Sequence, residues 1–366
     1  MSRITTMRGG RRGLTAAAAA AGLLALGAPA AAAASAAPAP KWHVVKSVPS
    51  GAGQFTAVVA TGKTTGWAFG GQFASATGPT AWQLKGGRWT QAAFPGRLAE
   101  TVVAAGASSP SDVWAFTQAG PGSRALHYNG RAWSVAKTFS ARIGGASVAG
   151  KNDVWVFGAN LFGTRALGAW YFNGRTWRLA GAGLQGGSAL SPKDVWAFSG
   201  TKVDHFNGSR WAATQLSSLL PARTLLNGPA ITGIIALSPR NVYAIGNGGA
   251  EDEGGPTVVL HYNGGKWAKA ATGSFGFGTS AGGGAQQVSS DGGTGLWLPM
   301  PGAGGQKSYM VHYAAGRLAP APLPGNSRGI ALGSVSRVPG TRDQLAGGET
   351  YTAPGVNQVA RVFMYS

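Results

Sequence analysis

A repeated unit constrains the fold of this chain more than any other feature. It is clearest at residues 109–133, where a Ser-Pro-Ser-Asp turn precedes the apolar run Val113–Phe116 and a Gly/Pro-rich loop. Leu126–Tyr128, an Asn-Gly pair and Trp133 complete it. The same order returns as KNDVWVFG…WYFNGRTW, SPKDVWAF…DHFNGSRW and SPRNVYAIG…LHYNGGKW. Short apolar runs separated by turn residues predict β-strands, and their regular return predicts an array of similar sheets.

Each unit divides into four expected strands, which we name A to D. In the first unit these are Phe55–Ala60, Gly66–Gly70, Thr80–Leu84 and a strand that Trp89 opens. The aromatic residue of strand B falls at Trp67, Trp114, Trp155, Trp196, Tyr243 and Trp297, with Leu345 in the seventh unit. The corresponding residue of strand D falls at Trp42, Trp89, Trp133, Trp177, Trp211 and Trp267, with Leu318 as the last. This spacing is typical of four-stranded propeller blades.

The two ends of the repeat predict how the ring closes. The segment from Arg361 to Ser366 is a C strand with no D strand after it, and Trp42 opens a D strand with no A, B or C strand before it. Joining the two gives seven complete blades and covers sheet edges that would otherwise be exposed. We therefore expect an all-β fold, a seven-bladed β-propeller of four-stranded antiparallel blades closed by the N-terminal strand at Trp42.

The first residues have the pattern of an export signal. A basic segment ends at Arg12, an apolar run covers Leu14–Leu26, and Ala-x-Ala sites follow. We expect a signal peptide at 1–37, a short linker at 38–40, a propeller domain at 41–366 and a secreted protein. Arg11-Arg12 resembles a twin-arginine signal, and ordinary Sec export stays open as the alternative. A membrane anchor is the other alternative, but the apolar run is too short.

Over residues 42–366 the chain resembles secreted bacterial β-propellers of the broad kelch, galactose-oxidase and WD40-like kind. The kelch Gly-Gly pair after strand B is approached only at Gly70-Gly71, Gly248-Gly249 and Gly347-Gly348, and the WD40 Trp-Asp ending is absent. Ser289-x-Asp291-x-Gly293 looks like the Asp-box of sialidase propellers, but it precedes a B strand. We interpret it as a stretched A–B turn. The resemblance implies architecture and leaves function open.

No residue pattern predicts catalysis, a metal or a cofactor. The 366 residues include no cysteine, which excludes disulfides and thiolate sites. His127, His205, His261 and His312 share one C-strand position in four blades, and equivalent positions diverge around the axis, so they are not expected to meet at one ion. All 13 tryptophans fall on expected strands, which predicts packing between blades. The 11 acidic residues offer few spare carboxylates beyond the loop acids Glu251–Glu253.

The meander fixes two faces of the expected ring. A–B and C–D turns share one end, the tight-turn face, and B–C and D–A connections share the other, the long-loop face. Basic residues of the C–D turns form a ring on the first, where pairing with turn aspartates is expected: Arg88, Arg131, Arg175, Arg210, Lys266 and Arg317. Exposed aromatic and basic residues on the second suit an anionic or carbohydrate ligand: Phe73, Phe94, Arg97, Arg124, Phe139, Arg142, Phe162, Arg165, Lys202 and Arg223.

The strongly positive net charge indicates which kinds of partner this protein would attract. The formal net charge is +20, and it is +16 without the four leader arginines. We expect an exported, monomeric, non-enzymatic binding module for an anionic cell-wall polymer, a polysaccharide or a protein partner. Nucleic acid suits the charge but not the export signal. The alternative is a glycan-active enzyme, a sialidase-like hydrolase or polysaccharide lyase, using an acid of Glu251–Glu253.

Overall fold

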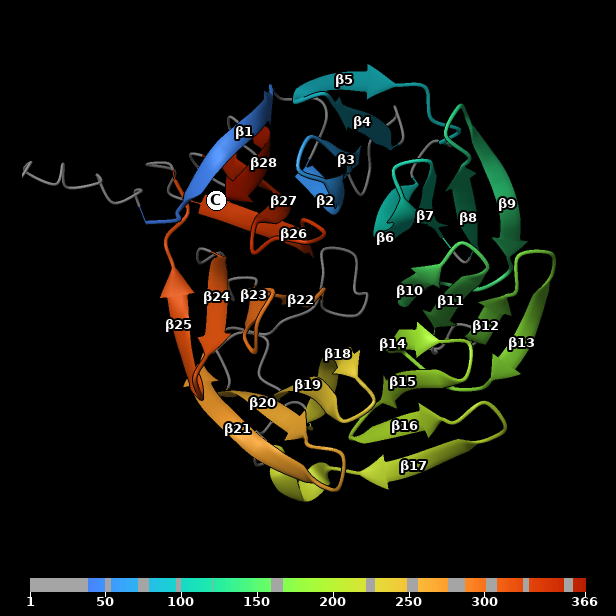
Figure 1. The fold of residues 1–366 in the computed structure, drawn as a ribbon, viewed down its shortest axis with the longest axis vertical. Coiled ribbons are helices and arrows are strands. Elements are labelled where there is room, and N and C mark those ends of the chain that lie inside the picture. Colours follow the sequence, from blue (N-terminus) through green and yellow to red (C-terminus); the bar gives the residue numbers. More distant parts are fainter. Residues whose placement is uncertain are drawn as a thin grey trace, which may run out of the picture. The chain divides into compact units, whose positions relative to one another are not determined.

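Seven antiparallel sheets of four strands make up the computed structural model. The structure describes residues 39–49, 54–71, 79–96, 100–120, 122–158, 167–221, 228–248, 256–275, 287–300, 308–324, 329–351 and 358–366. Residues 40–366 form one compact unit, and Figure 1 shows its sheets following one another around a central axis in chain order. The expected all-β, seven-bladed propeller is confirmed.

The strands follow the predicted A to D order in each blade. Blade 1 has β2 (Gln54–Gly62), β3 (Thr65–Gly71), β4 (Thr80–Lys85) and β5 (Arg88–Ala92); blade 2 has β6 (Thr101–Ser109), β7 (Asp112–Ala119), β8 (Gly122–Tyr128) and β9 (Trp133–Phe139). Blade 3 has β10 (Gly145–Gly150), β11 (Asp153–Gly158), β12 (Gly168–Phe172) and β13 (Trp177–Gly181); blade 4 has β14 (Gly186–Ser191), β15 (Asp194–Ser199), β16 (Lys202–Phe206) and β17 (Trp211–Gln215). Blade 5 has β18 (Ala230–Ser238), β19 (Asn241–Asn247), β20 (Pro256–Tyr262) and β21 (Trp267–Ser274). Blade 6 has β22 (Ser289–Ser290), β23 (Leu296–Met300), β24 (Tyr309–Ala314) and β25 (Arg317–Ala321), and blade 7 has β26 (Gly329–Arg337), β27 (Gln344–Tyr351), β28 (Val359–Tyr365) and β1 (Trp42–Val48).

Blade 7 is shared between the two ends of the domain, as predicted. Strand β1 pairs antiparallel with β28, with Trp42 opposite Tyr365 and Val48 opposite Ala360. The backbone pairing continues one residue further, between Lys41 and Ser366. The edge of β28 is therefore covered by the N-terminal strand, and the ring has no open blade at this point.

The core lies between neighbouring sheets. Seven clusters of buried apolar side chains occur in the described part of the chain, one at each interface between blades. One aromatic contact recurs: the B-strand aromatic of a blade packs against the last C-strand aromatic and the first D-strand tryptophan of the next. Trp67 does so with Tyr128 and Trp133, at centroid distances of 4.9 and 5.1 Å. At the closure, Trp297 contacts Tyr365 and Trp42 at 4.8 and 5.3 Å. The repeated aromatic pattern of the sequence is thus the packing pattern between blades.

Serine side chains hold the innermost strands together. The hydroxyls of Ser334 and Ser336 accept backbone N–H groups of Val58 and Ala60 in the next blade, at 2.8 and 3.1 Å. Ser147 accepts likewise from blade 4 at 2.9 Å. An A strand is the inner edge of its sheet, so its free N–H groups need such partners.

The insert between blades 4 and 5 contains a short element that the sequence did not predict. Ser217–Leu219 forms one turn of 3₁₀ helix, and the flanking Leu216 and Leu220 are buried in the core between these blades. The described residues contain no helix of the length and apolar character that a membrane span requires.

Candidate functional site

The central channel holds the largest of the described cavities. A space of about 720 Å³ lies at the A–B turn end and is lined by residues of the A strands and their turns, among them Val59, Ile235, Asn241, Gly292 and Arg337. The A strands present their free edges to it, so its walls include backbone groups as well as aliphatic side chains. A polar ligand would find hydrogen-bonding partners there.

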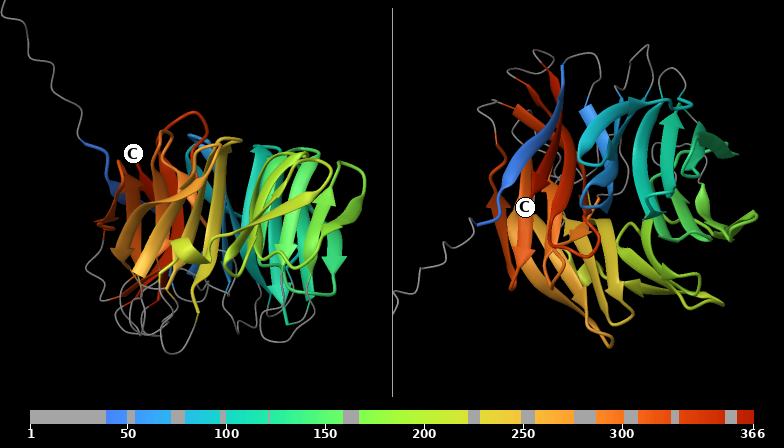
Figure 2. Two further views of the ribbon diagram at one scale, coloured as in Figure 1. Left: turned by 90° about the horizontal axis from the view of Figure 1, so that it is seen from below. Right: turned by 45° about the horizontal axis from the view of Figure 1, so that its top comes forward.

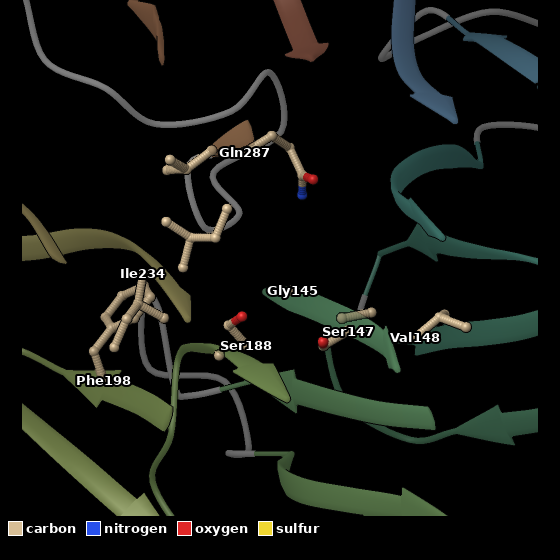
Figure 3. Close-up of a pocket in the computed structure, with 11 residues that line it drawn as sticks. Gly145, Ser147, Val148, Ser188, Phe198, Ile234 and Gln287 are labelled. Carbon is tan, nitrogen blue, oxygen red and sulfur yellow. The ribbon is translucent and has the colours of Figure 1, made fainter. Parts of the chain in front are cut away.

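A second space of about 220 Å³ continues the channel beside blades 3 to 5 (Figure 3). Ser147, Ser188 and Gln287 supply its polar side chains. Both serine hydroxyls already accept backbone N–H groups, from Ala189 and Ala236. In Figure 3 the amide of Gln287 points into the open space, so it is the side chain of this group that is placed to meet a ligand.

The tight-turn face surrounds the mouth of this channel. In the side view of Figure 2 the two ends of the strands lie at opposite edges of the ring. Every C–D junction on this face carries an exposed basic residue at or just before the start of its D strand, and blade 1 has a second one at Lys85. The seven residues beside the D strands are Lys41, Arg88, Arg131, Arg175, Arg210, Lys266 and Arg317. The sequence predicted six of them; Lys41 completes the ring because it precedes β1 at the closing junction of blade 7. Exposed cations also lie in five A–B turns: Lys63, Lys151, Lys193, Arg240 and Arg342.

Asn-Gly pairs fix the basic residues of four C–D turns. In blade 2, Oδ1 of Asn129 accepts the N–H groups of Arg131 and Ala132, both at 3.0 Å. Gly130 has φ +92°, a conformation that favours glycine. Asn173, Asn207 and Asn263 make the same bonds in the next three blades. The sequence assigned these pairs to hairpins through positive φ, and the structure adds the asparagine side chain as an acceptor that orders the turn.

The turn aspartates do not pair with this ring. Asp112 and Asp194 instead meet the C-strand imidazoles of their own blades: Nε2 of His127 and His205 lies 2.7 and 2.9 Å from the carboxylates. The expected turn-level ion pairing is therefore wrong, because the histidine one strand away takes the carboxylate. Within the described ranges the seven C–D cations form no salt bridge.

Each histidine also stacks on the B-strand aromatic of its blade. His127 lies 4.3 Å from Trp114, and His312 lies 4.3 Å from Trp297. His312 Nε2 contacts Asp291 at 3.0 Å, and His261 contacts Asn241 at 2.9 Å. Repeated carboxylate–imidazole–indole contacts of this kind stabilise single blades. The four histidines lie in four different blades, as the sequence indicated.

Burial and hydrogen bonding shift the pKa of the turn carboxylate Asp112 in opposite directions. Burial alone would raise the pKa of Asp112, but bonds from His127 and Ser108, with the charges of His127 and Lys151, hold the pKa below its ordinary value. In blade 5 an asparagine replaces the carboxylate, and burial lowers the pKa of His261. Asp112 is therefore charged at neutral pH, but its carboxylate is engaged within its own blade.

Three of the predicted long-loop residues have internal partners. Arg124 is buried and forms an ion pair with Glu100, with Nε 2.7 Å from Oε1. Phe139 is buried against Trp170 and Trp177. Lys202 lies 3.1 Å from the buried carboxylate of Asp204.

Two others are half-buried near the surface. Phe94 packs on Trp133 at 5.1 Å and lines an interblade cavity of about 430 Å³ that also contains Arg131. Arg142 lies beside Gln118, whose Oε1 accepts its Nε at 2.8 Å in the amide orientation that satisfies both groups. The remaining candidates, together with the acids Glu251–Glu253, lie outside the described residues: Phe73, Arg97, Phe162, Arg165 and Arg223.

The stretched A–B turn of blade 6 is confirmed. Asp291 lies between β22 and β23 and accepts the backbone N–H groups of Gly293 and Gly295, at 2.7 and 3.0 Å. Its carboxylate is thus bound within its own turn. Among the described residues, no three histidine or acidic side chains lie together as a metal site would need.

Comparison with known proteins supports the fold. No family model matches the sequence, and no curated protein matches it. Solved structures do. The WD40 repeats of RRP9 match at 12% identity and a TM-score of 0.58, over 90% of this chain and 98% of that one. YCF48 bound to D1 peptide matches at 12% identity and a TM-score of 0.53, over 88% of this chain and 96% of that one. The extracellular domain of a hybrid two-component system of B. thetaiotaomicron matches at 10% identity and a TM-score of 0.56, over 88% of this chain and 39% of that one. The chain is a seven-bladed β-propeller, and at these identities the likeness shows that fold alone.

Proposed function

We propose that this protein is an exported, non-catalytic β-propeller that binds an anionic polymer through its tight-turn face. The observation that carries the proposal is the complete ring of exposed C–D cations with no salt bridge among the described residues. A cation without a carboxylate partner keeps its full charge for a ligand, and a ring of them attracts a chain with many charges. The export signal expected from the sequence would bring the protein to a partner outside the cell, where an acidic polysaccharide or another cell-wall polymer fits.

The geometry favours the tight-turn face over the long-loop face as the main contact. In blades 2 to 5, asparagine side chains order the short turns that carry the cations, so little backbone entropy is lost on binding. On the long-loop face, Arg124 and Lys202 already pair with acidic residues. Phe94 and Arg142 remain as candidate ligand contacts near the rim.

Known propellers of this fold support binding as a use of the scaffold. YCF48 is described with a bound D1 peptide, and one neighbour is an extracellular domain. The glycan-active alternative depends on acids outside the described residues. Asp291, in the segment that looks like an Asp-box, is held by its turn and by His312. No observation on the described residues favours that enzyme.

Retention on immobilised polygalacturonate tests the proposal. Residues 38–366 should bind at low ionic strength and elute with NaCl, because exposed charges are screened at high salt. An uncharged polymer of similar length, such as dextran, serves as the control matrix. Equal retention on both matrices, or none on the anionic one, would contradict the proposal. Release of reducing ends from the polymer would favour the enzyme instead.

A further inference from the structure

Two arginines of blade 7 lie against one turn of blade 6, near the mouth of the central channel. Arg337 ends β26, and Arg342 lies in the turn before β27. A Cβ built on Gly292 would lie 3.3 Å from Nη1 of Arg337 and 3.2 Å from Cγ of Arg342. A Cβ on Gly293 would lie 4.0 Å from Nη2 of Arg342. Both side chains thus lie against the same two-glycine segment, in space that any other residue there would occupy.

The carboxylate of the blade 6 turn is hydrogen-bonded within its own blade and forms no salt bridge with either arginine. Asp291 accepts from two backbone N–H groups and from His312, which commits its oxygens to the turn. Gly292 has φ +86°, so a side chain at this position would be strained as well as crowded.

Neither guanidinium has a carboxylate partner in the part of the chain that the structure describes. No salt bridge involves Arg337 or Arg342, although Asp343 is adjacent to Arg342 in sequence. Both residues are exposed. The contrast is Arg124, which is buried and paired with Glu100. Two guanidinium groups that form no salt bridge, both near one glycine turn, present planar donors that match the oxygens of a phosphate or carboxylate.

The space that Arg337 lines sets the size and polarity of a ligand, and Arg342 approaches it through Gly292 and Gly293. Arg337, Gly292 and Gly293 line the cavity of about 720 Å³, together with Asn241 and Gln287. Its A-strand edges add backbone hydrogen-bonding groups. This combination suits a compact, hydroxyl-rich molecule with one acid group better than an apolar one.

We propose that Arg337 and Arg342 bind the acid group of a small polar ligand, a sugar phosphate or a sugar acid, whose remainder enters the channel. The site goes beyond polymer binding by the outer ring: it is a discrete pocket that recognises one oxyanion by bidentate hydrogen bonds. The polymer-binding proposal can fail while this site stands, and the reverse also holds.

Thermal unfolding with added ligand tests the site. Glucose 6-phosphate and glucuronate should raise Tm in a saturable way, since a ligand that binds only the folded state stabilises it. Glucose should give no shift, and inorganic phosphate should give a smaller one. The two acids also separate the source of the oxyanion, because whichever gives the larger shift identifies phosphate or carboxylate. No shift with either acid would overturn the proposal, and so would inorganic phosphate matching glucose 6-phosphate.

A conservative double variant separates recognition from charge. Arg337→Lys with Arg342→Lys keeps both charges but loses the planar forks, so the shift with the sugar acids should fall at least fivefold. Retention on polygalacturonate should stay unchanged. Arg175→Lys with Arg210→Lys, on the same face but away from the channel, is the matched control and should keep the full shift. An unchanged shift in the first variant would refute the role of these arginines.

Discussion

Removing the indole of Trp42 should weaken the closure of the ring more than any other single truncation in β1. Trp42 is 5% exposed and contacts Trp297 in blade 6 and Tyr365 in β28. Its indole N–H has no hydrogen-bond partner among the described residues, so the loss comes from packing. Replacing a large buried aromatic by alanine costs about 3–5 kcal/mol of unfolding free energy.

The upper half of that range applies here because two aromatic contacts are lost, and each adds about 0.5–1.5 kcal/mol beyond burial. A domain stable by about 5–15 kcal/mol would lose about a quarter or more of its stability. Urea unfolding of Trp42→Ala, followed by far-UV circular dichroism, measures this loss.

The matched control lies two residues along the same strand. Val44 is 37% exposed, so Val44→Ala should stay within about 0.5 kcal/mol of the wild type. If Trp42→Ala loses less than about 1 kcal/mol, or no more than Val44→Ala, the closing strand does not stabilise the ring as argued.

Three further predictions concern buried polar groups. Asn241→Asp should raise the pKa of His261 above its lowered wild-type value, because an adjacent carboxylate favours the imidazolium; an NMR titration of this histidine checks it. Asp112 has a lowered pKa in the folded state, so its contribution is present above the ordinary aspartate pKa and is lost as pH falls through the folded value. The stability gap between wild type and Asp112→Asn should therefore close as pH drops from about 5 towards 2, as urea midpoints would show. Glu100→Ala leaves the guanidinium of Arg124 buried without its carboxylate and should cost about 3–5 kcal/mol, measured by the same unfolding assay.

The blades could be predicted well from the sequence because short local patterns mark each strand and each turn. Aromatic spacing, Ser-Pro-x-Asp turns and Asn-Gly pairs all mark one repeat, and each recurs with little change. The unpaired D strand at Trp42 then required closure with the strand ending at Tyr365, which the register confirms. Even the degenerate positions Leu318 and Leu345 fall on the predicted strands.

Side-chain partners were harder to predict, because they depend on contacts across strands. Arg124 looked like a surface ligand residue, but its contact with Glu100 brings together residues from a linker and from β8. The aspartates of the A–B turns looked like partners for the basic ring. A signal for their true partners was present: the aspartate or asparagine position recurs together with the C-strand histidine in blades 2, 4, 5 and 6. This recurrence indicated a contact in those four blades, whereas in blade 3 Asp153 holds the same position with no histidine on the C strand.

The contact of Arg337 and Arg342 with the glycine turn of blade 6 could not be predicted from the sequence. It depends on how the A–B turn of blade 7 packs against Gly292 and Gly293 of blade 6. Lys41, by contrast, could have been assigned to the ring once closure was accepted, since it precedes Trp42 as Arg88 precedes Trp89.

The most direct test of the central claim compares two variants of equal charge. The first replaces four cations of the C–D turns by glutamine: Arg131, Arg175, Arg210 and Lys266. The second replaces four cations of the outer D strands: Lys46, Lys137, Arg178 and Lys269. The measured quantity is the Kd for polygalacturonate at fixed ionic strength. Four exposed contacts at about 0.3–0.5 kcal/mol each predict a Kd about tenfold weaker for the first variant, and a change under about twofold for the second. Equal weakening in both variants would show that net charge binds the polymer, and that the tight-turn face has no special role.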